Sequence, residues 1–67
     1  MTADDMLAKV QAMAKSVKDK PWQHEMAFNF SLRVHNRLVD MGREDIALLV
    51  QCEMEMSYPE FPIDFGR

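Results

Sequence analysis

The sequence predicts an all-α fold: one domain of three helices followed by an extended C-terminal tail. Two observations predict it. Apolar residues recur at three- and four-residue steps along most of the chain, and the breaks fall at Pro21, Gly42 and Pro59. We therefore expect helices over about residues 3–19, 22–41 and 43–57, and a tail rich in proline and aromatic residues over 58–67.

The first predicted helix has a capping signal and one apolar side. Thr2 and Asp5 have the three-residue spacing of a capping box. The apolar side holds Met6, Leu7, Val10, Met13, Ala14 and Val17. Pro21 interrupts this pattern because proline has no amide donor, and it can also open the next helix. A short connection at this point predicts that the first two helices are antiparallel.

The second predicted helix is apolar around much of its circumference. One stripe holds Met26, Phe30, Val34, Leu38 and Met41, and a neighbouring stripe holds Phe28, Leu32, His35 and Val39. Together they span about 240° of the helix, whereas a helix packed on a single neighbour needs only about 100°. The pattern predicts a central helix that is covered from two directions.

The third predicted helix begins after Gly42, which favours a left-handed helix cap. Its apolar side is expected to hold Ile46, Leu49, Val50, Met54 and Met56. Residues 51–56 also alternate as a strand does, but methionine and glutamate favour a helix. We expect Glu53 in the middle of the apolar side, where its carboxylate needs a partner such as His35 or an arginine of a second copy, or else a raised pKa.

Three short helices cannot cover all of this apolar surface. The surplus is expected on the second side of the 22–41 helix and at the 54–65 end of the chain. Since soluble monomers rarely expose large apolar patches, the sequence predicts a homodimeric helical bundle built around the second helix, with a different protein as the alternative occupant. The candidate core or dimer residues are Met26, Phe28, Phe30, Leu32, Val34, His35, Leu38, Val39 and Glu53.

Composition and charge exclude several classes of protein. With 48% hydrophobic residues the chain is too apolar to be disordered, yet no apolar run approaches the ~20 residues of a membrane span. The acidic start does not resemble a secretory signal, so we expect a cytoplasmic protein without membrane contact. The net charge is −3, and residues 44–67 carry six acidic residues against one arginine. Nucleic acid is therefore an improbable partner, and this end would attract a basic one.

Residues capable of site chemistry are few and poorly spaced. His24 and His35 are eleven residues apart, about 16 Å along one helix, so they cannot share a metal ion. Cys52 has no recognisable orienting group. We expect no cofactor, no metal and no catalytic activity. A metal-binding or catalytic role of His35 with Glu53 is the third-ranked hypothesis.

The favoured function is that of a small non-enzymatic regulator, an adaptor or inhibitor that occupies a surface of another protein. The candidate partner-binding residues are Arg33, Arg37, Met54, Tyr58, Phe61 and Phe65. The alternative is an auxiliary transcriptional or nucleic-acid-associated regulator. It would use the strip formed by Arg33 and Arg37, because arginine can read base edges or grip carboxylates through two hydrogen bonds.

Overall fold

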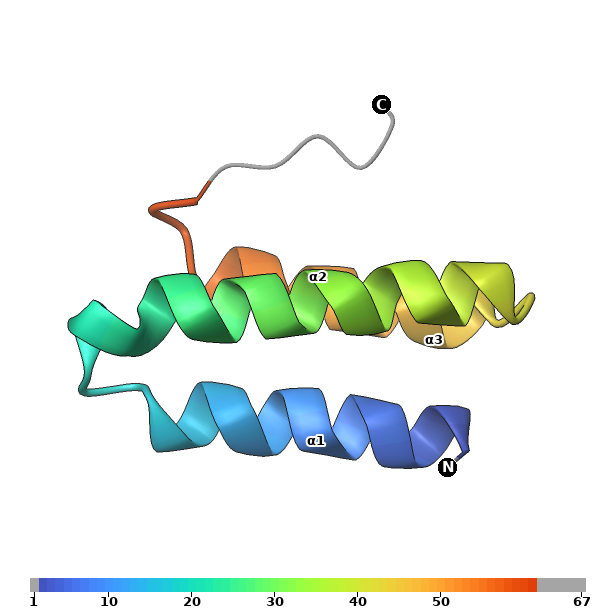
Figure 1. Cartoon of the computed structure of the whole chain (residues 1–67), viewed down its shortest axis with the longest axis horizontal. Helices are drawn as coiled ribbons and strands as arrows, with labels where there is room; N and C mark the ends of the chain where they lie inside the picture. The colour runs from blue at the N-terminus through green and yellow to red at the C-terminus, as the bar shows by residue number, and fades with distance from the viewer. Residues whose placement is uncertain (1, 62–67) are drawn as a thin grey trace.

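The computed structural model describes residues 2–61 and confirms the all-α prediction for them. Three α-helices follow one another, α1 (Ala3–Ser16), α2 (His24–Asp40) and α3 (Glu44–Ser57), and the short 3-10 helix η1 (Pro21–Gln23) precedes α2. Successive helices are antiparallel, so α1 and α3 run in the same direction (Figure 1). Each of the three α-helices contacts the other two, which makes the fold a three-helix bundle. In the described part of the chain no helix combines the length and apolarity needed to cross a membrane.

The first helix begins with the predicted capping box. The Thr2 hydroxyl accepts a hydrogen bond from the Asp5 amide, and the Asp5 carboxylate accepts one from the Thr2 amide, both at 3.2 Å. These bonds lower the pKa of Asp5. The helix ends at Ser16, three residues before the predicted end, because the chain tightens into a turn in which the Lys20 amide reaches the Val17 carbonyl at 2.9 Å. Pro21 then opens η1, where its missing amide costs nothing.

The turn between α2 and α3 depends on Gly42, as predicted. Gly42 has φ +77°, a left-handed conformation that residues with a Cβ rarely adopt. Its amide donates to the Val39 carbonyl at 3.0 Å, and the Arg43 amide donates to the Leu38 carbonyl at 2.9 Å. This pair of bonds is the Schellman motif, which satisfies the last carbonyls of α2 and reverses the chain within three residues.

Both α1 and α3 contact α2, as the prediction of two neighbours requires, but α1 and α3 also contact each other, so α2 is one of three equivalent members of the bundle and not its centre. Ala27, Ser31 and Leu38 are fully buried along the middle of α2. The buried core of the bundle also includes Ala3, Met6, Val10, Ala14, Val17, Ile46, Ala47, Val50, Met54 and Tyr58.

Two of the candidate core or dimer residues of α2 are on the surface and not in the core. Met26 is 55% exposed and Val39 is 40% exposed. Their exposure shows that α1 and α3 leave part of each apolar stripe uncovered. Phe28, Phe30, Leu32 and Val34 are half-buried and pack against the core as predicted. The two neighbouring helices thus cover part of the apolar surface of α2, and the predicted homodimer stays a prediction.

The buried side of α3 differs from the predicted one. Ile46, Val50 and Met54 are buried as expected, but Leu49 is 50% exposed and Met56 is 74% exposed. Ala47 and Gln51 are buried in their place. The side of α3 that faces α1 and α2 thus includes Ala47 and Gln51, and the side that holds Leu49 and Met56 faces outward. The prediction that Leu49 and Met56 share one side of the helix with Ile46, Val50 and Met54 is therefore wrong.

Candidate interaction surface

The outward side of α3 carries an apolar stripe. It consists of Leu48, Leu49, Cys52 and Met56, which we call the outer stripe. Leu48 is 57% exposed, and Cys52 is a free, exposed cysteine. Spacings of three, four and seven residues bring these side chains to one side of the helix. Sequence reasoning missed Leu48, although a projection of α3 with Leu48, Cys52 and Met56 on one side would have found the stripe.

Each flank of the outer stripe borders an open groove between helices. Met56 lines the groove between α1 and α3, together with Lys15, Lys18 and Glu53. Leu48 lines the groove between α2 and α3, together with Val39, His35 and Glu44. The apolar surface therefore continues from Leu48 onto Val39 of the neighbouring helix. Its charged border is basic beside Met56 and acidic beside Leu48.

Acidic residues predominate on α3 itself. Residues 44–57 contain four acids, Glu44, Asp45, Glu53 and Glu55, and no lysine or arginine. Arg43, just before the helix, donates two hydrogen bonds to the Asp45 carboxylate at 3.2 and 3.3 Å. This contact lowers the pKa of Asp45, so that carboxylate stays charged in mild acid. The outer stripe thus lies on a helix of negative charge.

Glu53 is not in the middle of the buried side, contrary to the prediction. It is half-buried at the edge of α3, and its carboxylate accepts a hydrogen bond from the Ser57 hydroxyl at 2.5 Å. The Nδ1 atom of His35 lies 3.3 Å from the Asn36 side-chain oxygen. Among residues 2–61, no three His, Cys, Asp or Glu side chains are grouped as metal ligands would be.

The candidate partner-binding residues are divided between surface and core. Arg33 and Arg37 are exposed on α2. Met54 and Tyr58 are each only 1% exposed, so both belong to the core instead of the surface. Met54 is buried because it shares the inward side of α3 with Val50, and Tyr58 is buried because its ring packs against His24 and Phe28 of α2.

The remaining two candidates lie in the C-terminal segment. Phe61 is half-buried against Phe28, with ring centroids 5.2 Å apart. Phe65 lies outside the described residues. The part of the predicted tail that the structure describes therefore packs on the bundle.

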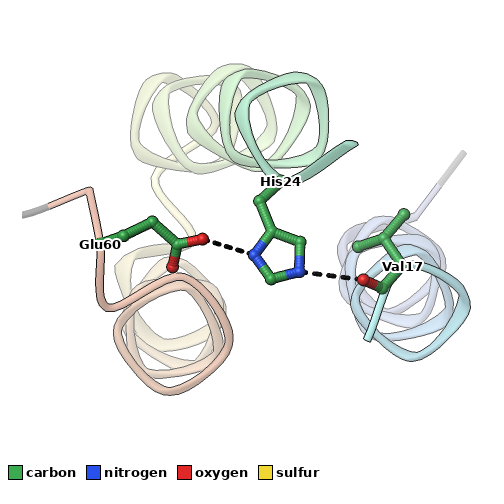
Figure 2. Close-up of polar contacts among 3 residues, drawn as sticks. All are labelled: Val17, His24 and Glu60. Carbon is green, nitrogen blue, oxygen red and sulfur yellow. Dashed lines mark hydrogen bonds and ion pairs between the residues drawn. The ribbon is translucent and has the colours of Figure 1, made fainter. Parts of the chain in front are cut away.

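A histidine that sequence reasoning left without a role joins three segments of the chain. His24 Nδ1 lies 2.6 Å from a Glu60 carboxylate oxygen, and Nε2 lies 2.9 Å from the Val17 carbonyl oxygen (Figure 2). We call this arrangement the His24 clip. Both partners are acceptors, so the doubly protonated imidazolium is the form that donates both hydrogen bonds. The signal in the sequence is weak: a histidine in the first turn of a helix after a tight connection.

The electrostatics of the His24 clip agree with its geometry. The hydrogen bond to Glu60 raises the pKa of His24, and the bond to Val17 acts in the same direction. The Val17 carbonyl is at the C-terminal end of α1, where the helix dipole also favours a cation. The pKa of Glu60 is lowered by its own backbone amide and by the imidazole.

The aromatic ring of Tyr58 supports the clip from inside. Tyr58 meets His24 edge-to-face at 5.3 Å and Phe28 edge-to-face at 6.3 Å. Its hydroxyl is buried and makes no hydrogen bond of ordinary geometry within the described residues. Burial raises the pKa of this hydroxyl, and the neighbouring Ser31 side chain opposes that shift. The Ser31 hydroxyl itself donates to the Ala27 carbonyl at 2.9 Å.

Comparison with known protein families, with curated protein sequences and with solved structures gave no match to this chain. The functional conclusions below therefore depend on the residues and their geometry alone.

Proposed function

We propose that this chain is a small non-enzymatic regulator that acts by binding another protein, and that the outer stripe of α3 is its binding surface. The observation that carries the proposal is the exposure of three large apolar side chains on one side of α3, at 57% for Leu48, 50% for Leu49 and 74% for Met56. A contiguous apolar surface of this kind is typical of protein interaction sites.

Two features support the outer stripe as an adaptable binding surface. Met56 is unbranched and flexible, and such side chains recur at surfaces that adapt to a partner. The grooves beside the stripe offer polar and charged groups at its border, which matches the arrangement of an apolar centre and a polar rim in protein interfaces.

The arginine strip of α2 supports the nucleic-acid alternative less well. Arg33 and Arg37 are exposed, but the same outward side of α2 also carries Glu25 and Asp40. The two positive charges are thus balanced by two negative ones. Phosphate binding needs a surplus of positive charge, which this surface lacks.

The proposal is tested by affinity capture from the native cell with matched variants. Leu49→Gln weakens the outer stripe, whereas Met26→Gln alters a side chain of similar exposure on a different helix. We expect a stoichiometric partner with the wild type and with Met26→Gln, and its loss with Leu49→Gln. Retention of every partner by Leu49→Gln would refute the assignment of this surface. Circular dichroism of each variant verifies that the fold is intact.

A further inference from the structure

The charge around the outer stripe indicates what kind of protein covers it. Glu44 and Asp45 lie at the N-terminal end of α3, and Glu55 lies near its C-terminal end. All three are exposed. With Glu53, they give α3 four negative charges and no positive one between residues 44 and 57. Arg43, which pairs with Asp45, offsets one of these charges, so residues 43–57 carry a net charge of −3 that positive charges on a partner would complement.

We infer that the outer stripe binds an amphipathic helix whose apolar side is flanked by lysine or arginine. This inference rests on the proposed function and names the chemistry of the partner. A helix that packs along α3 can place apolar side chains between Leu48, Leu49 and Met56. Its basic flanks would lie beside the carboxylates of α3, and such complementarity accelerates association and selects between partners.

The charge pattern also assigns an orientation preference to the partner. Lys15 and Lys18 border the stripe beside Met56, on the side of α1. At the other end of the stripe, Glu44 and Asp45 are accompanied by one base, Arg43, which pairs with Asp45. The acidic surplus is therefore greatest toward the Glu44 end. We expect the basic residues of the partner helix to concentrate at that end and to be sparse beside Lys15 and Lys18.

A second copy of this chain fits the same surface less well. Pairing two α3 helices through their outer stripes would bring together two helices that each carry four acids and no base over residues 44–57. Like charges brought together at an interface disfavour association. In an antiparallel pairing, Lys15 and Lys18 of each copy would lie toward the Glu44 end of the other copy, and these two bases offset only two of the four acids.

The inference is tested with a displayed library of amphipathic helices of 14 residues, the length of α3. Leucines are fixed on one side, and the flanking positions vary among lysine, glutamate and glutamine. The library is selected on the full chain and counter-selected on the Leu49→Gln variant. We expect helices with lysine flanks to be enriched about tenfold or more over helices with glutamate flanks, a difference of about 1.4 kcal/mol in binding free energy.

Two further variants test the source of the selectivity. Replacing Glu44 and Glu55 together by glutamine should lower the affinity of a selected lysine-flanked helix, most strongly at low salt, because screening already weakens the attraction at high salt. Met26→Gln is the matched control and should leave the affinity unchanged. Fluorescence anisotropy of the labelled helix measures both effects, and circular dichroism confirms that the variants are folded.

The outcomes separate this inference from the proposed function. Selected helices that bind the outer stripe without any preference for lysine would overturn the basic partner and leave the protein-binding function intact. If no helix is enriched and light scattering shows twice the 7.8 kDa mass for the wild type but not for Leu49→Gln, a second copy covers the stripe and the basic partner is wrong. If no helix is enriched and the chain is monomeric, both the inference and the proposed surface fail.

Discussion

The inner and outer sides of α3 contain the same kinds of side chain and have different environments. Met54 is 1% exposed on the inner side, whereas Met56, two residues further along, is 74% exposed on the outer side. Val50 is fully buried, whereas its neighbour Leu49 is half exposed. Hydrophobicity alone therefore does not decide which side of this helix enters the core. The neighbours decide, because α1 and α2 leave room for one side of α3 only.

The largest expected effect distinguishes the two methionines. Met54→Ala should lower the free energy of unfolding by about 2–5 kcal/mol, since it removes buried contacts and leaves a cavity. Met56→Ala should change it by no more than about 0.5 kcal/mol. Urea titration followed by circular dichroism measures both.

A domain of this size has little stability to spare, so Met54→Ala could be largely unfolded in water. Ile46→Val is a milder change on the same side, with an expected loss of about 0.5–1.5 kcal/mol, so its free energy of unfolding can still be measured. Equal losses for Met54→Ala and Met56→Ala would show that the outer side is also packed, and would contradict the assigned faces of α3.

A smaller effect is expected at the turn that fixes which side of α3 faces inward. Gly42→Ala introduces a Cβ at φ +77°, where nothing lies within 4 Å of the added atom. The cost is therefore conformational strain alone, about 1–2 kcal/mol. The same urea titration measures it. A neutral result would mean that the turn relaxes out of the left-handed conformation without disturbing α3.

The His24 clip should make the free energy of unfolding depend on pH. The folded-state pKa of His24 is raised above its ordinary value of 6.5, so the clip stabilises the fold fully below about pH 6.5 and loses this contribution as the pH rises through the raised pKa. Glu60→Gln removes the charged acceptor and should lower the pKa of His24.

Nuclear magnetic resonance titration of the His24 ring measures this change directly. Melting temperatures of wild type and Glu60→Gln should differ in mild acid and converge at alkaline pH. A His24 pKa that is the same in both proteins would show that Glu60 does not hold the imidazolium.

The smallest expected effect concerns the hydroxyl group of Tyr58. The Tyr58 hydroxyl is buried without a hydrogen bond of ordinary geometry, so Tyr58→Phe removes a group that contributes little. The free energy of unfolding should stay within about 0.5 kcal/mol or rise slightly. A loss of more than about 1 kcal/mol would reveal a hydrogen bond, with Ser31 as its nearest candidate.

Local rules predicted the local features of this fold. The capping box at Thr2, the left-handed Gly42 and the helix-opening Pro21 each depend on residues a few positions apart, and each was read correctly. The contact of α2 with two neighbouring helices also followed from the sequence, because a helix that is apolar over most of its circumference needs two neighbours.

The inward side of α3 did not follow, because α3 has apolar residues on opposite sides and the choice between them depends on α1 and α2. Leu49, Met54 and Met56 therefore shared one predicted side but occupy two. The His24 clip could not be predicted either, since the residues that His24 contacts are 7 and 36 positions away along the chain. What can be derived from neighbouring residues was predicted, and what depends on the packing of distant segments required the structure.

The placement of Cys52 gives this protein a natural reporter. The chain has one cysteine, and it is exposed in the centre of the outer stripe. A fluorophore or spin label attached to that sulfur would report on the outer side of α3 without any added mutation. Its mobility and solvent access would fall when another helix covers the stripe and would stay unchanged when a ligand binds elsewhere.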